Sequence, residues 1–178
     1  ANVPALALGV AAGMRARDAL SRLAASALTP APAPPAAGEH RFVDPSSSRG
    51  GVHVIVADSI SLIRPEDAGH VLVAASHGGL LGGKPDSAVK YPVFAVVTND
   101  ADRGIDNAGI SRLPALDARG IAGACVSAFS ARIGDGRSQW ETGIVSVLNA
   151  TAARHGGVVG QSCNDFAAAM VAARIAQL

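Results

Sequence analysis

A short apolar run that ends in a histidine and two glycines constrains this chain more than any other stretch. Residues 71–75 read Val-Leu-Val-Ala-Ala, which is the pattern of a buried strand. The run stops at residues 76–79, Ser-His-Gly-Gly, where a titratable imidazole stands beside residues that let the backbone approach a ligand closely. Ligands of open α/β sheets bind beyond the carboxyl ends of strands. The sequence therefore predicts an α/β fold with a functional site at this turn.

Other apolar runs predict a sheet around this strand. The expected strands are 52–57, 70–75, 92–97 and 122–126. Helical patterns separate or follow them around 110–116, over Ser138 to Arg154 and over Asn164 to Ala176. Strands that alternate with helices favour a parallel sheet. We expect a three-layer, Rossmann-like fold with a mostly parallel sheet of about four to five strands and helices on both faces. The short link at Gly69 allows one antiparallel neighbour.

The N-terminal part predicts a separate arm. Residues Pro4 to Leu28 have roughly helical spacing of apolar residues, and residues 30–35 form a proline-alanine linker. We therefore divide the chain into an arm and linker, 1–38, and one α/β domain, 39–178. The arm packs either on its own domain or on a neighbouring subunit, and we expect a homo-oligomer. Residues 39–51 predict a loop.

Composition excludes several classes of partner. The net charge of +1 and the 3% of aromatic residues argue against a nucleic-acid surface, which needs clustered basic and stacking side chains. No apolar run is long and uncharged enough to predict a membrane span. Cys125 and Cys163 stand far apart and form no metal or redox motif. We expect a cytoplasmic protein that uses no metal and no cofactor.

Polar residues follow each predicted strand. They are Asp58 and Ser59, Ser76 and His77, Asn99 and Asp100, and Ser127 with Ser130. Parallel strands would bring all four clusters to one rim of the sheet. The segment 130–138 adds Arg132, Asp135 and Arg137 just before a helix. This combination predicts one site for a small anion.

Each of these residue types suggests a role. Histidine has a pKa near neutrality, so His77 is the predicted general acid or base. The other predicted catalytic residues are Ser76, Asp100 and Asp135, and the predicted substrate-binding residues are Gly78, Gly79, Lys84, Asn99, Ser130, Arg132 and Arg137. We expect His77, Asn99 and Arg132 to lie within about 10 Å of one another, the span of a small-ligand pocket.

Three known motifs are approximated without being completed. His77-Gly78-Gly79 resembles the oxyanion loop of α/β-hydrolases over three residues, but the Gly-x-Ser-x-Gly elbow of that family is absent. Residues 78–84 approximate a phosphate loop, but Pro85 stands where Ser or Thr should hold magnesium. Asp100, Asp102 and Asp106, with Asp135, offer carboxylates for a divalent cation in no known calcium spacing.

These residues favour an enzyme that acts on a small anionic, carboxylate-bearing metabolite. Hydrolysis of an amide, a related C–N bond or an ester fits the predicted acid–base and anion-binding groups best. A lyase or isomerase could use the same proton transfer. Two non-catalytic readings stay open: a subunit that binds or senses a small anion, and a subunit that its N-terminal helix docks to a larger complex.

Overall fold

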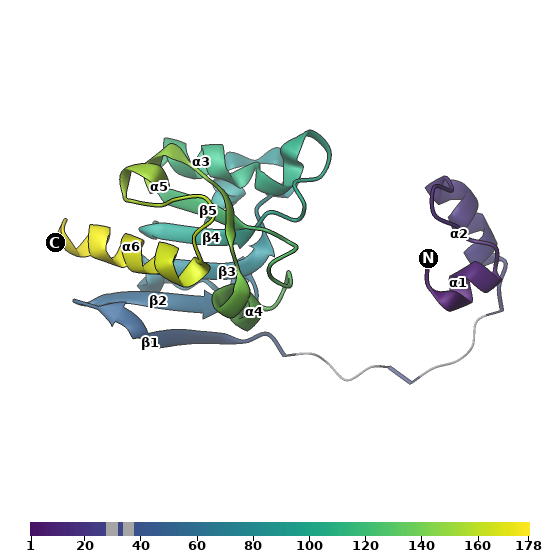
Figure 1. Cartoon of the computed structure of the whole chain (residues 1–178), viewed down its shortest axis with the longest axis horizontal. Helices are drawn as coiled ribbons and strands as arrows, with labels where there is room; N and C mark the ends of the chain where they lie inside the picture. Colours follow the sequence, from purple (N-terminus) through teal and green to yellow (C-terminus); the bar gives the residue numbers. More distant parts are fainter. Residues whose placement is uncertain (28–31, 34–37) are drawn as a thin grey trace. The chain divides into compact units, whose positions relative to one another are not determined.

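The structure, a computed structural model, describes residues 1–27, 32–33 and 38–178 (Figure 1). The chain divides into two compact units, Ala1–Ala37 and Gly38–Leu178, which we call the N-terminal unit and the C-terminal unit. Most of the predicted proline-alanine linker, and Leu28 at the end of the predicted first helix, lie outside the described residues.

The N-terminal unit holds two short helices, so the prediction of one helix from Pro4 to Leu28 is wrong. Helix α1 spans Val3–Ala7 and helix α2 spans Ala16–Ala24. Gly9 and Gly13, between them, adopt φ angles of +76° and +82°, which a helix does not use. The Arg22 guanidinium donates to the Gly9 carbonyl over 2.8 Å and ties the connection to α2.

One six-stranded sheet forms the centre of the C-terminal unit. Its strands lie in the order of the sequence: β1 Arg41–Arg49, β2 Val52–Ala57, β3 Val71–His77, β4 Ala95–Asn99, β5 Ala122–Val126 and β6 Val145–Leu148. Strands β2 to β5 are parallel, whereas β1 and β6 pair antiparallel at the two edges. The α/β class is confirmed, but the sheet is mixed rather than mostly parallel and has more strands than predicted. Since β2 and β3 are parallel, Gly69 does not form a hairpin.

The segments that connect successive strands cover the two faces of the sheet, and the handedness of the crossovers explains which segments cover which face. Parallel crossovers are almost always right-handed, so a sheet built strictly in sequence order receives all its crossovers on one face. That face carries five 3-10 segments and one helix: η1 Ile60–Leu62, η2 Pro65–Asp67, η3 Leu81–Gly83, η4 Pro85–Ala88, η5 Ile105–Ile110 and α3 Arg112–Ala118. The strand order never reverses, so the sheet lacks the switch point of a doubly wound fold. The Rossmann-like part of the prediction is not confirmed.

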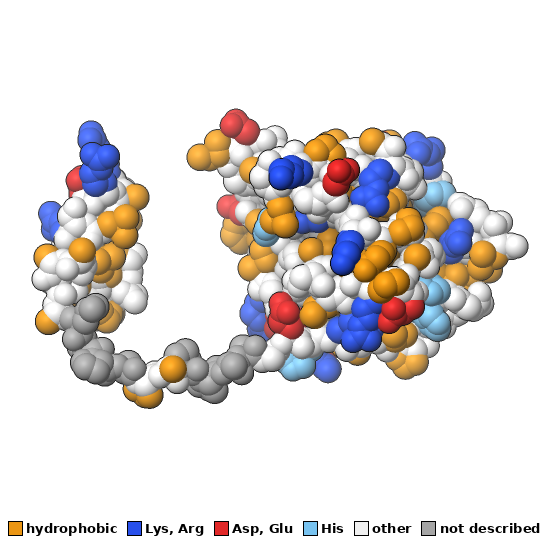
Figure 2. All heavy atoms as spheres, turned by 180° about the vertical axis from the view of Figure 1, so that it is seen from behind, with side chains coloured by type: hydrophobic (Ala, Val, Ile, Leu, Met, Phe, Trp, Pro, Cys, Tyr) orange, Lys and Arg blue, Asp and Glu red, His pale blue; other side chains and the backbone are white. Residues whose placement is uncertain are grey.

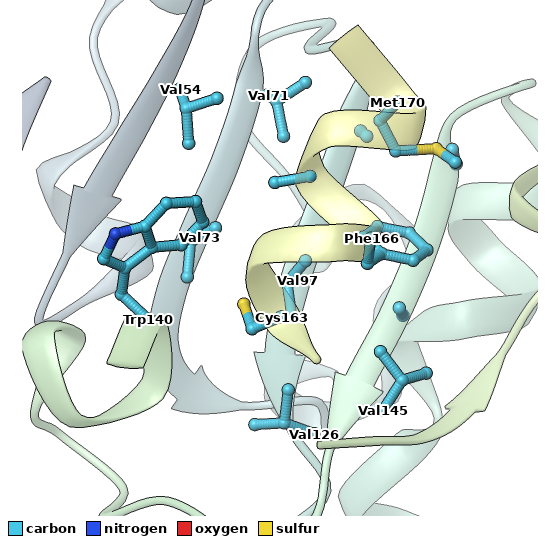
Figure 3. Packing of buried hydrophobic residues seen from close by; sticks show 14 of the residues in the cluster. Val54, Val71, Val73, Val97, Val126, Trp140, Val145, Cys163, Phe166 and Met170 are labelled. Carbon is cyan, nitrogen blue, oxygen red and sulfur yellow. The ribbon is translucent and has the colours of Figure 1, made fainter. Parts of the chain in front are cut away.

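The opposite face carries three helices and the larger apolar core. They are α4 Gly136–Thr142, α5 Ala150–Arg154 and α6 Cys163–Ile175. Trp140 of α4 and Phe166 and Met170 of α6 pack on strand residues such as Val73 (Figure 3). Alternate strand residues, Ile55 and Leu72 among them, point to a second core under the 3-10 segments. Both faces are therefore buried, as the near-continuous apolar strands require.

The predicted helix from Ser138 to Arg154 is wrong, because it is two short helices separated by β6. The chain leaves the helix at Gly143, where the backbone is extended. A side chain there would lie 2.4 Å from the Gln139 carbonyl oxygen, so glycine is the residue that allows this turn. Asp135, rather than Ser138, caps α4, and its carboxylate accepts from the Ser138 amide over 2.9 Å. The last helix agrees closely with its prediction.

The loop predicted over 39–51 is also wrong. It is strand β1, which contains Pro45 and three serines and has a register shift between Asp44 and Arg49. Proline is tolerated in a strand at the edge of a sheet, where one side needs no ladder hydrogen bond. Strand β1 also brings the residue before it, His40, against the end of β2.

Candidate functional site

The carboxyl edge of the parallel strands gathers the predicted polar clusters. Asp58 directly follows strand β2, and strands β3 and β4 end at His77 and Asn99. The segment 130–138 folds back over these strand ends. The Gly134 amide donates to the Ala75 carbonyl over 2.8 Å. A loop that sequence reasoning placed at this rim is thus bonded to the end of β3.

A cavity of about 710 Å³ opens at one end of this edge, between the start of β1 and the loop before α4. Its lining residues are Gly38, Glu39, His40, Arg41, Phe42, Asp58, Gly134, Asp135 and Arg137. Two of the predicted site residues, Asp135 and Arg137, lie in it. His40 was not predicted as a site residue, because it lies in the stretch 39–51, which the sequence presents as a loop.

His40 and Asp58 form a hydrogen-bonded pair in this cavity. Arg41 pairs with Ala57 in the antiparallel ladder, so the preceding residue lies opposite Asp58. The His40 ring nitrogen Nδ1 is 3.0 Å from Asp58 Oδ2, and the His40 amide donates to the same oxygen over 2.7 Å. The Asp58 side chain is 14% exposed and that of His40 is 82% exposed. A nearly buried carboxylate therefore orients an accessible imidazole.

Glycine at position 136 makes this arrangement possible. A side chain there would lie 2.7 Å from the Ala57 carbonyl carbon, so only glycine lets the start of α4 approach β2 so closely. The Gly136 amide donates to Asp58 Oδ1 over 2.8 Å. Burial raises the pKa of Asp58, but the hydrogen bonds from Gly136 and His40 outweigh it, and the pKa lies below its ordinary value. Asp58 is thus a carboxylate at neutral pH.

The basic residues around the cavity differ in how freely they can bind an anion. Arg41 is not available to bind a ligand, because its guanidinium pairs with the buried Asp67. Arg132 pairs with Asp135 over 2.8 Å. Arg137 is exposed; its guanidinium lies 5.8 Å from the Phe42 ring centre and 3.7 Å from Glu141. Exposed pairs of this kind are weak, so Arg137 is the cation most available to a ligand.

Asp135 serves the local structure as well as the cavity. Its carboxylate accepts from the Ser138 amide and from the Arg132 guanidinium. These hydrogen bonds, the one from Ser138 first, hold the pKa of Asp135 below its ordinary value. The predicted catalytic aspartate is therefore ionised and engaged as a helix cap.

His77 lies at the same edge but in a different setting. It is exposed at the end of β3, and its ring nitrogen Nδ1 accepts from the Gly79 amide over 3.1 Å. The Gly78 amide donates to the Asn99 carbonyl over 2.7 Å. Side chains at Gly78 and Gly79 would lie 2.6 and 2.7 Å from the carbonyl oxygens of Gly109 and Ala108 in η5. The two glycines thus allow close packing of the chain, and both amides already have acceptors.

A buried arginine that sequence reasoning missed holds this turn. Arg112 donates to the carbonyls of Gly79 over 2.9 Å and of Ser87 over 2.7 Å, and also to that of Ala88. Burial lowers the pKa of its guanidinium. In the sequence, Arg112 stands at the start of an ordinary amphipathic helix, where an arginine normally faces water. Lys84, the predicted anion-binding lysine of the same region, is exposed beside η4.

Asp100 joins three separate segments. Its carboxylate accepts from the amides of Asp102 and Ala128, each over 2.9 Å, and from the Ser146 hydroxyl over 2.7 Å. It is almost fully buried. The structure therefore gives this predicted catalytic residue three partners and little access to a ligand.

The remaining predicted residues also bond to the chain around them. The Ser76 hydroxyl accepts from the Ile60 amide and the Ser130 hydroxyl from the Ile144 amide, each over 2.9 Å. Asn99 pairs with His77 in the sheet register, and its amide donates to the Ala131 carbonyl, next to Arg132, over 3.3 Å. His77 and Asn99 are thus neighbours in the sheet, and the backbone next to Arg132 bonds to Asn99, whereas the Arg132 guanidinium turns to Asp135. That the three side chains share one ligand span of about 10 Å stays a prediction.

Two further features bear on the chemistry. Within the described ranges, no group of three or more His, Cys, Asp or Glu side chains is placed to hold a metal ion. Asp102 and Asp106, two of the aspartates that could bind a metal, instead adopt left-handed backbone angles and are exposed, Asp102 in a turn and Asp106 in η5. Burial raises the pKa of both Cys125 and Cys163 to about 12, so neither thiol is ionised at neutral pH.

No known protein family, curated protein or solved structure matches this chain. Among the helices of the described residues, none combines the length and apolar character needed to cross a membrane. Figure 2 shows basic, acidic and hydrophobic side chains interspersed over one face of the C-terminal unit.

Proposed function

We propose that this protein is a hydrolase that cleaves an amide, a related C–N bond or an ester of a small, carboxylate-bearing metabolite at the His40–Asp58 cavity. The observation that carries the proposal is an accessible imidazole bonded to a nearly buried carboxylate. The same cavity is lined by an arginine with only weak partners. This is the combination that proton transfer on an anionic substrate requires.

The Asp58 carboxylate sets the role of the imidazole. A carboxylate cannot donate when ionised, so His40 Nδ1 carries the proton of their hydrogen bond and Nε2 is left as a base. His40 Nε2 takes a proton from a water molecule as that water attacks the substrate carbonyl. The resulting imidazolium returns the proton to the leaving nitrogen or oxygen. Arg137 binds the substrate carboxylate and fixes the carbonyl near the water.

Water is the nucleophile we assign. In the described part of the chain, the His40 ring hydrogen-bonds to Asp58 and to no serine, threonine or cysteine. A serine or cysteine nucleophile would need to lie within hydrogen-bond reach of the base. A lyase or isomerase would use His40 in the same way, on a C–H proton instead of water.

A second candidate is non-catalytic binding of a small anion at the His77 turn. The observation that favours it is the hydrogen bond from the Gly79 amide to His77 Nδ1. That bond places the ring proton on Nε2 and makes the exposed imidazole a hydrogen-bond donor. A donor without a carboxylate partner suits an anion better than proton abstraction.

The test is a substrate screen with matched variants. The full chain is incubated with N-acetyl and N-carbamoyl amino acids and with monoesters of dicarboxylic acids, and products are followed by proton NMR. We expect turnover of one class, and a loss of about 10²–10⁴-fold in both His40→Asn and Asp58→Asn. His53→Asn, an exposed histidine in β2, is the control. Turnover that survives in His40→Asn overturns the proposal.

Binding without turnover gives a different pattern. In that case N-acetylglycine would shift resonances in the NMR spectrum of the protein without being consumed. If Arg137→Met abolishes the shifts, the cavity is a binding site only. If His77→Asn abolishes them while Arg137→Met does not, the anion site lies at the His77 turn.

A further inference from the structure

A second cavity, of about 500 Å³, adjoins the His40–Asp58 cavity. It is lined by the segment after β5 and by α4, with Ala128, Phe129, Ser130, Ala131, Arg132, Arg137, Ser138, Glu141 and Thr142. Arg137 lines both cavities. Its guanidinium lies 5.8 Å from the ring centre of Phe42 in the first cavity and 3.7 Å from Glu141 in the second. The arginine that we assign to the substrate carboxylate therefore stands at the border of two cavities.

Phe129 is the large apolar side chain of the second cavity. It is 85% exposed, whereas the other three phenylalanines of the chain pack in or against the larger core. Its backbone amide donates to the Ser127 hydroxyl over 3.2 Å. The neighbouring Ala128 amide donates to the Asp100 carboxylate over 2.9 Å. The turn that carries this exposed aromatic ring is thus held in place by hydrogen bonds of its own.

The hydroxyl groups of the second cavity are already bonded to the chain. Thr142 donates to the carbonyls of Ser130 and Ser138 over 2.6 and 2.8 Å. The Ser130 hydroxyl donates to the Ser127 carbonyl over 2.8 Å. The Ser138 hydroxyl accepts from the Arg132 amide over 3.0 Å. A polar ligand group would compete with these bonds, so the cavity favours an apolar group, which needs no hydrogen-bond partner.

The charged residues of the second cavity have both signs. Arg132 pairs with Asp135, and Arg137 pairs with Glu141. A basic ligand group would be repelled by the arginines, and an acidic one by Glu141. An aromatic ring meets neither repulsion, because guanidinium groups stack on its face. It also gains a ring-to-ring contact with Phe129.

On the basis of the hydrolase function proposed above, we infer that the second cavity binds the side chain of the substrate, and that the substrate is an N-acyl α-amino acid with an aromatic or large apolar side chain. The carboxylate, the amide and the side chain of such a compound branch from one carbon atom. A carboxylate held at Arg137 therefore lets the amide reach His40 in the first cavity while the side chain enters the second, against Phe129. Phe129 is thus a specificity-determining residue.

The experiment compares two substrates that differ only in the side chain, N-acetylphenylalanine and N-acetylglycine. Proton NMR gives kcat/KM of the full chain for both. We expect the wild type to prefer N-acetylphenylalanine by about 10–100-fold. Phe129→Ala should lose about tenfold of that preference, because the ring contact is gone, and should cleave N-acetylglycine like the wild type. The control is Ile105→Ala, which removes an exposed apolar side chain that lines neither cavity and should keep the preference.

Folding of Phe129→Ala is measured separately. Trp140 is the only tryptophan of the chain and lies in the larger core, so its fluorescence follows unfolding of the C-terminal unit. Because the Phe129 ring is exposed, the variant should melt like the wild type.

Turnover of N-acetylglycine distinguishes this assignment from the proposed hydrolase function. If the wild type cleaves N-acetylglycine as well as N-acetylphenylalanine or better, the hydrolase function stands and the side-chain site is overturned. A preference that persists in Phe129→Ala also overturns the site. If neither compound is cleaved, hydrolysis of N-acetyl amino acids fails, and NMR titration of the protein with both compounds decides about the site. Tighter binding of N-acetylphenylalanine that depends on Phe129 then supports it, and equal affinity or no binding overturns it.

Discussion

Two histidines lie at the same edge of the sheet and differ in what bonds to Nδ1. At His40 the partner is the Asp58 carboxylate, an acceptor, which leaves Nε2 as a base. At His77 the partner is the Gly79 amide, a donor, which leaves Nε2 carrying a proton. Both rings are exposed. The comparison teaches that the neighbour of an imidazole, more than its position at a strand end, decides which chemistry it can perform.

The largest expected difference is in turnover. Because only His40 is set up as a base, His40→Asn should lose about 10²–10⁴-fold in kcat, whereas His77→Asn should stay close to the wild type. The measurement is kcat and KM for the best substrate of the screen. Equal losses in both variants would break the comparison and restore a single site that includes His77.

The next effect is on stability and is confined to the His77 side. Arg112→Met leaves the Gly79, Ser87 and Ala88 carbonyls without their buried donor and should cost about 3 kcal/mol or more. Urea unfolding measures this loss. Arg137→Met, at the exposed arginine of the His40 cavity, is the matched control and should stay within about 0.5 kcal/mol. A small loss in Arg112→Met would mean that water replaces the guanidinium.

Alanine substitutions of glycines should change stability by a smaller amount and should affect the His77 turn more than the His40 cavity. A methyl group at Gly78 would lie within 3 Å of three atoms, so Gly78→Ala should cost about 1–3 kcal/mol. Gly38, in the lining of the His40 cavity, has open space around its Cβ position. Gly38→Ala should therefore be neutral or slightly stabilising. Thermal unfolding measures the stability of both variants, and a stable Gly78→Ala protein would show that η5 can move.

The smallest effect is on the pH dependence of stability. The pKa of Asp58 is lowered in the folded state, so its stabilisation is present above the ordinary value of 3.8 and is lost as pH falls through the folded value. Wild type should exceed Asp58→Asn in stability at neutral pH, and the two should converge in acid. Urea unfolding at a series of pH values tests this. A constant difference down to the lowest pH would mean that the carboxylate charge contributes nothing.

The strands that the sequence predicts well are the buried ones. β2 and β5 lie at their predicted bounds, because strands covered on both faces are continuous apolar runs. The edge strands β1 and β6 were not predicted, because neither stands out as an apolar run of its own. β1 contains Pro45 and three serines, and β6 continues the apolar pattern of α4 through Gly143. At an edge, the partner strand stabilises residues whose own preferences point elsewhere.

The residues of the candidate site also divide into those that the local sequence predicts and those that it does not. Asp58, Asp135 and Arg137 were accessible to sequence reasoning because they follow a predicted strand or precede a helix. His40 was not, since its role depends on the antiparallel pairing of β1 with β2. Arg112 gives no signal, because nothing in its neighbourhood in sequence distinguishes a buried arginine from an exposed one. Local patterns predict where strands end, but not which side chains distant pairings bring there.

The Gln139 side chain links helix α4 to strands β3 and β4 at the His77 edge of the sheet. Strands β3 and β4 lose register between Val73 and His77, and the buried Gln139 amide bridges the gap by donating to the Ala74 and Val97 carbonyls. The Gln139 side chain thus supplies hydrogen bonds between β3 and β4 where the backbone ladder is interrupted. Local opening of α4 must break these two hydrogen bonds from Gln139. We therefore expect the backbone amides of α4 and of the end of β3 to exchange with deuterium as one cooperative unit.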